Sequence, residues 1–308
     1  MKIPKSAYFL IAVLAGACWG THGTFASLLG QYGISDNAVA LLCPLFYATF
    51  FLILVAKDDI RKVKFPRHLL PVLIFYGAVS AVYNFAIIKA YWHIPVGIVH
   101  TIVFCNLFLL MIFSRILFKT PLTKQKAFFA ALAVLGVAML LNVFDTEVSW
   151  SALGIFCTLL SMAAWAGMVI TEKYLLIKGA DGNALVMYNG YFAAIFIACV
   201  ANPVTAVTEV AHAVSVSGGM VLLPLLGYAV ITSFGSYYCY LVAIRKMEPT
   251  LVQLGYVADP LVATVLGVII FGQILLPIQY AGLVLILAVV IAVQLLEFRS
   301  EKAGNNVS

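Results

Sequence analysis

Asp259 is the residue of this chain whose type and position point most directly to chemistry. It lies well inside the apolar stretch 249–271, where an ionised carboxylate costs about 2.5 to 3.5 kcal/mol if the stretch crosses a membrane. Its neighbour Pro260 has no backbone N–H, so we expect a kink and an unpaired carbonyl at Tyr256. A carboxylate beside a free carbonyl can bind a cationic group or carry a proton. The alternative is a structural acid that a neighbouring helix satisfies.

Two tryptophans and a histidine occupy comparable places in other apolar stretches. His22 follows Trp19 by three residues, so both share one face of a helix. An imidazole there can hydrogen-bond a ligand or titrate near neutral pH, or it can be an ordinary packing residue. Trp165 repeats the setting of Trp19, and two inward-facing indoles suit an aromatic or cationic ligand through stacking or cation–π attraction. Tryptophans also fill helix interfaces, so both interpretations stay open.

Two charged residues complete the set that can carry or gate charge. Glu172 follows Trp165 by seven residues and shares its helix face. It is either a group that carries protons or half of an ion pair with Lys173 at the membrane surface. Lys89 either reaches the outer headgroups or acts as a counter-ion for an anionic group at a cavity mouth. The coupling or gating candidates are Asp259, His22, Glu172 and Lys89.

Hydroxyl and amide side chains form stripes on further apolar stretches. Tyr83 and Asn84 end one stripe and Tyr237 belongs to another. A lipid-facing stripe would not place so many donors at mid-depth, so we expect a cavity wall, although tyrosines near helix ends also form interfacial belts. The full set expected around a central cavity is Trp19, His22, Tyr83, Asn84, His100, Asn106, Trp165, Tyr237, Tyr256 and Asp259.

The composition places these residues in a membrane protein. Of the 308 residues, 64% are hydrophobic and 10% are charged, whereas soluble domains are about one quarter charged. Apolar stretches long enough to cross about 30 Å of hydrocarbon recur along the chain. The six cysteines fall in separate stretches, which predicts no disulfide, no metal site and no cofactor. We predict an all-α integral membrane fold with ten spans, at residues 7–29, 37–56, 69–88, 95–117, 127–143, 151–170, 184–201, 220–244, 249–271 and 274–296.

The basic residues orient these spans. With the N-terminus in the cytoplasm, all of the 18 Lys and Arg residues except Lys89 fall on the cytoplasmic side. Because Lys and Arg in short loops set the orientation, both termini are predicted to be cytoplasmic. The basic segments then serve as anchors at the membrane surface, and we expect no nucleic-acid binding despite the net charge of +6.

The second half of the chain repeats the pattern of the first. When the two halves are aligned, Asn106 corresponds to Asp259. Either the two polar side chains face each other near a twofold axis, or Asn106 makes an ordinary interhelical hydrogen bond. Five spans separate the copies, so we predict two inverted five-helix repeats, at residues 1–146 and 147–308, with a binding site between them. The matching segments are Trp19-Gly20 with Trp165-Ala166-Gly167, and Phe118-Lys119-Thr120-Pro121-Leu122 with Phe271-Gly272-Gln273-Ile274-Leu275.

Further segments bear a family resemblance, namely Ala17-Cys18-Trp19-Gly20, Asn84-Phe85-Ala86-Ile87-Ile88-Lys89-Ala90, Leu132-Ala133-Val134-Leu135-Gly136-Val137, Tyr240-Leu241-Val242-Ala243-Ile244 before Glu248-Pro249, and Ala281-Gly282-Leu283-Val284-Leu285-Ile286. In these the chain resembles the drug/metabolite transporter superfamily, and within it the bacterial ten-helix EamA-type proteins. The resemblance implies a 5+5 fold and a central cavity lined mainly by helices 1, 3, 4, 6, 8 and 9. Where the family often has Gly-Glu, this chain has Lys119-Thr120 and Gly272-Gln273, so no role of that Glu is carried over.

The repeats and the resemblance together predict a secondary transporter in the cytoplasmic membrane of a bacterium. It would move an amino acid, an amine or a related small metabolite by alternating access, with export slightly favoured. Proton coupling and gradient-driven exchange both stay open, as do a monomer and a homodimer; the expected partners are the solute, membrane lipid and, under coupling, protons. An enzyme is not expected, because the chain holds no HExxH, GxSxG or Gly-rich phosphate loop. A channel or receptor is the other alternative.

Overall fold

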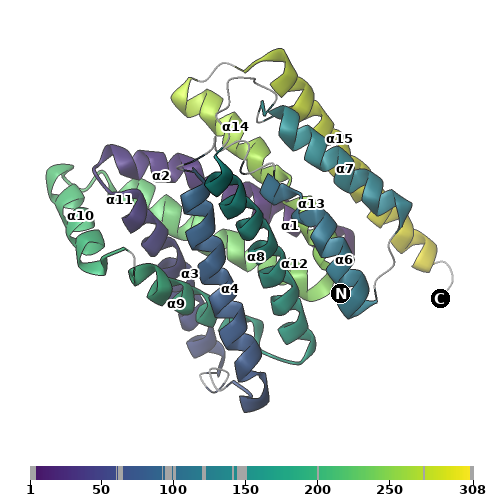
Figure 1. Ribbon diagram of the computed structural model, residues 1–308, viewed down its shortest axis with the longest axis horizontal. Coiled ribbons are helices and arrows are strands. Elements are labelled where there is room, and N and C mark those ends of the chain that lie inside the picture. Colours follow the sequence, from purple (N-terminus) through teal and green to yellow (C-terminus); the bar gives the residue numbers. More distant parts are fainter. Residues whose placement is uncertain are drawn as a thin grey trace.

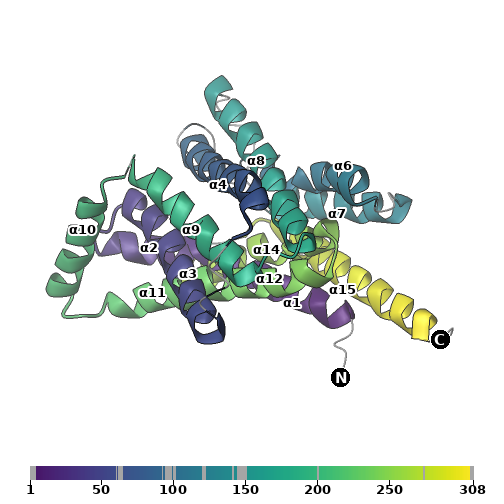
Figure 2. The ribbon, with the colours of Figure 1, turned by 90° about the horizontal axis from the view of Figure 1, so that it is seen from below.

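The computed structural model of the protein describes residues 5–59, 61, 65–91, 93, 99, 102–119, 123–140, 142–143, 151–199, 201–272 and 275–305. Every regular element in these ranges is a helix, and most of the helices lie side by side in one bundle (Figure 1). The start of the first helix and the end of the last lie toward the same end of the bundle in both views (Figures 1 and 2).

The lengths and compositions of the helices establish a multi-pass membrane protein. Six helices are long and apolar enough to cross a membrane: Ser6–Gln31, Asn37–Asp59, Arg67–Ile87, Ala152–Ile177, Leu222–Lys246 and Pro249–Ile270. A seventh span results if Gly182–Ala198 and Pro203–Val216, which are bent by 97° to each other, are counted as one. Three shorter apolar helices, Ile102–Phe118, Ala127–Leu140 and Pro277–Val293, lie where three more spans are predicted. The count of ten spans stays a prediction.

In the first half of the chain the helices follow the predicted spans in order, and the first span is divided at Thr21. The elements are α1 (Lys5–Gly20), α2 (His22–Gln31), α3 (Asp36–Asp59), a 3₁₀ turn (Arg67–Leu69), α4 (Leu70–Tyr91), α6 (Asn106–Phe118) and α7 (Lys124–Leu140).

In the second half, two predicted spans are interrupted. The eighth span passes from α11 through a π-helical segment into α12, and the ninth breaks between α13 and α14. The elements are α8 (Ala152–Ile177), α9 (Gly182–Ala198), α10 (Pro203–Val216), α11 (Leu222–Gly227), the π-helix η3 (Tyr228–Gly235), α12 (Ser236–Lys246), α13 (Pro249–Gly255), α14 (Ala258–Phe271) and α15 (Pro277–Asn305).

Helix α10 occupies a segment that the sequence predicts as an outer loop. Asn202 caps it by accepting the N–H of Val204 at 2.9 Å, and Pro203 takes the first helical position, where no N–H is needed. Glu209 ties α10 to the start of α3, because its carboxylate accepts both the N–H and the hydroxyl of Ser35, at 2.9 and 2.8 Å. The sequence did not predict this helix because its apolar residues alternate with polar ones and form no run long enough to resemble a membrane span.

Helices α7 and α15, one from each half of the chain, are in close contact. Gly136 and Gly282 face each other across this interface: a Cβ on Gly282 would lie 2.8 Å from the carbonyl oxygen of Gly136 and 2.5 Å from the N of Leu140. Helix α7 lies at the predicted fifth span of the first half and α15 at the predicted fifth span of the second half. Corresponding spans of the two halves therefore meet at this helix pair.

Helix α1 approaches the broken ninth span through glycines. A Cβ on Gly16 would lie 2.8 Å from the Cα of Tyr256, and one on Gly20 would lie 2.5 Å from the carbonyl oxygen of Asp259. On the facing helix, Gly255 lies equally close to Ala12. Small residues allow this contact between backbones, as is usual for helix pairs in membranes.

We predict that Gly20→Ala destabilises the protein by about 1 to 3 kcal/mol, because the added methyl group meets backbone atoms that cannot move aside. Gly23→Ala is the matched control, since a Cβ there would have open space within 4 Å and alanine is favoured over glycine in helices. Thermal unfolding of the purified proteins in detergent measures the difference. Equal unfolding temperatures for the two variants would show that the contact is not tight.

Candidate functional site

Trp19 is the centre of an aromatic cluster that packs against the main hydrophobic core. The centroid of its ring lies 5.0 Å from that of Tyr256 and 5.2 Å from that of Tyr237, both edge to face. Trp165 lies at 5.9 Å and Tyr240 at 5.8 Å. Pairs of this kind each contribute about 0.5 to 1.5 kcal/mol beyond the area that they bury. The cluster therefore holds α1 of the first half against α8, α12 and the end of α13 in the second.

Trp165 extends the cluster toward α4. Its indole N–H donates to Oε1 of Gln253 at 3.0 Å, and its ring packs 5.0 Å from that of Tyr83. Asp259 follows Tyr256 by three residues, and its backbone carbonyl lies against Gly20, next to Trp19. Asp259, Tyr83 and the two indoles thus belong to one neighbourhood, although they come from four helices.

The cluster borders accessible space. Trp19, Tyr83, Trp165 and Tyr237 are all only partly buried, although they pack against the core. Tyr256 is 4% exposed, and its hydroxyl has no hydrogen-bond partner among the residues that the structure describes. Leaving a buried hydroxyl unpaired costs about 1 to 3 kcal/mol. A polar group of a bound molecule, or water, would remove this cost.

The backbone is irregular where the cluster lies. The first span breaks at Thr21, whose hydroxyl bonds the carbonyl of Cys18 at 2.6 Å and lies 2.7 Å from the hydroxyl of Thr232. Thr232 belongs to η3, in which Ser233 bonds the carbonyl of Tyr228, and Ser236 at the start of α12 bonds the carbonyl of Thr232. These hydroxyls replace part of the regular pattern of backbone hydrogen bonds, which lipid could not do. π-Helical segments and broken spans are common at functional sites.

The ninth span breaks where Pro260 predicts it, but not in the predicted manner. The carbonyl of Tyr256 is not unpaired: it accepts the N–H of Asp259 at 2.9 Å. The chain compensates for Pro260 by tightening the turn before it, so this bond spans three residues instead of four. The prediction of a free carbonyl beside the carboxylate is therefore wrong. The Asp259 side chain itself is partly exposed.

Asn106 begins α6 and is 1% exposed. Neither its amide N nor its amide O has a hydrogen-bond partner among the described residues, so the interhelical hydrogen bond proposed for it is absent there. The facing arrangement of Asn106 and Asp259 stays a prediction. An amide that is buried without partners is costly, and such groups in native proteins mark sites where a ligand or water completes the bonding.

His22 begins α2, immediately after the break at Thr21. Its Nε2 lies 3.0 Å from the hydroxyl of Tyr228, which also bonds the carbonyl of Val39 at 3.2 Å. The ring itself is exposed. His22 therefore lies next to the π-helix and contacts Tyr228, whereas Trp19 contacts the aromatic cluster.

Glu172 lies in the core and not at the surface. It is 2% exposed, and its Oε2 accepts the hydroxyl of Tyr76 at 2.9 Å, while its Oε1 has no partner in the described part of the chain. The Lys173 ammonium donates instead to the carbonyls of Ile244 and Met247, at 2.5 and 2.9 Å, at the end of α12. The alternative of an interfacial ion pair between Glu172 and Lys173 is therefore wrong. Adjacent residues on a helix point in different directions, so Glu172 and Lys173 contact different parts of the protein.

The remaining predicted residues lie elsewhere. Asn84 is partly buried and donates to the carbonyl of Ser80 in its own helix at 2.8 Å. The ammonium of Lys89 lies 5.8 Å from the ring centroid of Phe85. His100 lies outside the described residues.

Sequence reasoning missed Gln253 and Tyr47. Gln253 is a polar residue inside an apolar span, which is the signal by which it could have been found. Tyr47 contacts Tyr237 at 4.0 Å between ring centroids and bonds Oδ1 of Asn189 at 2.9 Å, but nothing in its sequence neighbourhood distinguishes it from an interfacial tyrosine.

Comparison with known proteins decides the family. The EamA-like transporter family matches the chain twice, at residues 6–142 and 152–295. The chain belongs to the EamA-like transporter family. The resemblance read from the sequence is confirmed, and with it an architecture of two repeats.

Solved structures share the fold of this EamA-like transporter, and 28 chains match it. One, described only as a crystal structure of a protein, has 16% sequence identity and a TM-score of 0.77. The match covers 96% of this chain and 99% of that one. At this identity the likeness shows the fold alone. No curated protein matches the sequence.

Both EamA-like segments contribute to the aromatic cluster. The segment 6–142 supplies Trp19 and Tyr83, and the segment 152–295 supplies Trp165, Tyr237 and Tyr256. The cluster is therefore built across the two repeats of the family and not inside one of them.

We predict that Tyr76→Phe lowers the free energy of unfolding by about 1 to 3 kcal/mol, because it removes the described donor to a buried carboxylate. Tyr280→Phe is the control, since the Tyr280 side chain is 56% exposed. In a Glu172→Gln background the effect of Tyr76→Phe should become smaller, because the buried group is then neutral. Thermal unfolding of the parent protein, the three single variants and the double variant measures these effects. A loss no larger than that of the control would contradict the bond.

Proposed function

We propose that this protein is a secondary transporter that moves a small organic metabolite across the cytoplasmic membrane of a bacterium by alternating access. One observation carries the proposal. Partly exposed aromatic side chains from both repeats meet around Trp19, beside the breaks at Thr21 and Tyr256. Discontinuous helices between two repeats are the usual setting of substrate sites in such carriers.

The chemistry of the cluster favours a solute with a cationic or aromatic part, such as an amine or an amino acid. Indole and phenol faces attract cations by about 0.5 to 2 kcal/mol each, with the larger values in desolvated sites. Asp259, whose backbone lies against Gly20, adds a carboxylate in the same neighbourhood. The hydroxyl of Tyr256 and the amide of Asn106, which have no partner among the described residues, can bond polar groups of the solute.

Alternating access would arise from movement between the repeats. Trp19 is held by helices of the second half, so a rotation of one half against the other changes the contacts of the cluster directly. Irregular turns at Thr21, in η3 and at Tyr256 lie within three of the spans, and each would be a point at which its span can bend. Bending at these turns would open the cluster to one side of the membrane and then to the other.

The orientation that we propose places both termini in the cytoplasm with ten crossings. The basic residues support it by their positions, and the start of α1 and the end of α15 lie toward the same end of the bundle (Figure 1). An even number of crossings agrees with that placement. Export is the direction slightly favoured.

Three groups are available for coupling to protons. Asp259 follows Tyr256 of the cluster by three residues, Glu172 is buried against Tyr76, and His22 is exposed beside Tyr228. Of these, Asp259 is placed so that a bound cation and a proton would compete for one carboxylate. This competition is the coupling that we propose. Exchange of one solute for another requires no proton and is the alternative.

We predict that amines and amino acids raise the unfolding temperature of the purified protein and that sugar phosphates do not. A solute at 100 times its dissociation constant should stabilise the folded state by about 2.7 kcal/mol. Trp165→Leu should abolish this shift, whereas Phe128→Leu, at an exposed position on α7, should retain it. Stabilisation by anions alone would contradict recognition by the aromatic cluster and Asp259.

We also predict that Asp259→Asn separates coupling from solute movement. In vesicles containing the purified protein, an imposed pH gradient should drive accumulation of the stabilising solute by the parent protein and not by Asp259→Asn. Counterflow of labelled solute, which needs no gradient, should persist in the variant at reduced affinity.

Asp58→Asn is the control for this experiment, because Asp58 is exposed at the end of α3. Gradient-driven accumulation that survives Asp259→Asn would remove the coupling role. Absence of saturable counterflow in the parent protein would contradict a carrier and favour a channel or receptor.

A further inference from the structure

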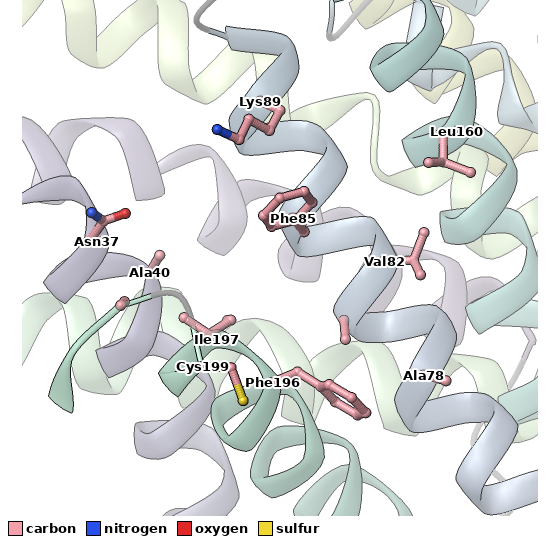
Figure 3. Close-up of a pocket in the computed structure, with 12 residues that line it drawn as sticks. Asn37, Ala40, Ala78, Val82, Phe85, Lys89, Leu160, Phe196, Ile197 and Cys199 are labelled. Atoms are coloured by element: carbon pink, nitrogen blue, oxygen red, sulfur yellow. The ribbon is translucent and has the colours of Figure 1, made fainter.

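A second cavity lies away from the aromatic cluster, between the helix pair α3 and α9 and the helix pair α4 and α8. Its volume is about 580 Å³, within the range of about 300 to 1,000 Å³ that ligand pockets occupy. Figure 3 shows Phe85 and Lys89 of α4 pointing into the space that faces Asn37 and Ala40 of α3 and Ile197 of α9. Of the site residues that the sequence predicts and the structure describes, Lys89 alone lines this cavity.

The floor of this lateral pocket is a close contact between helices. A Cβ on Gly77 would lie 2.8 Å from the Cβ of Phe192, so α4 and α9 nearly touch there. The pocket begins one residue further along α4, at Ala78, and small side chains at Ala81 and Ala40 keep it open. The two helix pairs therefore converge below the pocket and leave a wedge of space above it.

The walls of the lateral pocket are apolar and open to the outside. Val82, Phe85 and Phe196 line it and are 40%, 49% and 47% exposed. Apolar side chains on the outer surface of a membrane span contact lipid tails, which offer no polar partner. An acyl chain of the surrounding bilayer can enter such a pocket without any opening of the bundle.

The polar groups of the pocket gather at one end. Asn37 is the first residue of the span Asn37–Asp59, and Lys89 follows the span Arg67–Ile87 by two residues. Both therefore lie at the level of the headgroups on the same side of the membrane. From Ala78 to Lys89 the helix rises about 16 Å at 1.5 Å per residue, about half of the 30 Å of hydrocarbon. The pocket is as deep as one leaflet.

We propose that the lateral pocket binds one anionic phospholipid of the outer leaflet. One acyl chain would lie along Val82, Phe85 and Phe196, and the phosphate would meet the ammonium of Lys89, with Asn37 as a second polar partner. Lys89 is the one Lys or Arg residue that is predicted to lie on the outer side of the membrane. Binding of an anionic headgroup would explain a lysine on that side. This proposal rests on the proposed orientation of the protein but not on the solute site, because Tyr83 contacts Trp165 and the pocket is lined by other positions of α4.

The occupant would act on the helix that carries Tyr83 and Tyr76. A chain wedged above the contact of Gly77 and Phe192 keeps α4 apart from α3 and α9. Lipid in the pocket therefore stabilises the arrangement that the structure shows.

The test compares phosphatidylglycerol with phosphatidylcholine of the same acyl chains, added to the full-length protein after its own lipid has been removed in detergent. Native mass spectrometry gives the number bound and the affinity, and the shift in unfolding temperature gives an independent measure. One lysine near a membrane surface contributes about 1 kcal/mol toward an anionic lipid, or about fivefold in affinity. We expect one phosphatidylglycerol to bind about fivefold more tightly than phosphatidylcholine.

Lys89→Gln should abolish this preference. Lys178→Gln should keep it, because Lys178 makes a similar contact with an aromatic ring, 5.6 Å from that of Tyr174, outside the pocket. Ala81→Phe should fill the pocket and weaken the binding of both lipids, and Ala40→Phe fills it from the facing helix if the first variant does not fold.

Equal affinity for the two lipids in the parent protein, or a preference that survives Lys89→Gln, would overturn the proposal. A free fatty carboxylate that binds more tightly than phosphatidylglycerol would also overturn it, because the pocket would then serve an amphipathic solute and not a membrane lipid.

Discussion

The structure depends on one constraint: inside a membrane every backbone N–H and C=O must find a partner within the protein. Regular helices meet it by themselves, and this chain departs from them at Thr21, in η3 and at Tyr256. At each departure a substitute bond is present. The Thr21 and Ser233 hydroxyls bond nearby carbonyls, and the N–H of Asp259 takes the carbonyl that Pro260 cannot reach. The irregular backbone is therefore built into the fold, and the aromatic cluster lies beside it.

The second requirement is close contact between helices. Gly16 and Gly20 bring α1 against the broken ninth span, and Gly136 and Gly282 bring α7 against α15. In lipid no hydrophobic force drives helices together, so such contacts contribute through dispersion and small residues make them possible. The approach of α1 brings the Trp19 ring within 5.0 Å of that of Tyr256. Helix packing and the site are thus one arrangement.

The sequence predicted a helical membrane protein of two repeats and several of the residues that meet. Hydropathy and the repeated tryptophans were sufficient to bring Trp19 and Trp165 together, because both rest on periodic patterns. Two expectations failed for local reasons. The Tyr256 carbonyl is bonded because the turn before Pro260 tightens, and Glu172 turns to Tyr76 because neighbouring residues on a helix face different sides. Tyr47 could not be predicted, since contacts between distant helices leave no periodic signal.

The central claim is that a solute binds at the aromatic cluster between the two repeats. The most direct measurement is a cryo-electron microscopy map of the protein with the solute that most stabilises it. We expect density for the solute in contact with the rings of Trp19 and Trp165 and within hydrogen-bond distance of the Tyr256 hydroxyl. Density for the solute in the lateral pocket beside Lys89, with the cluster unoccupied, would contradict it.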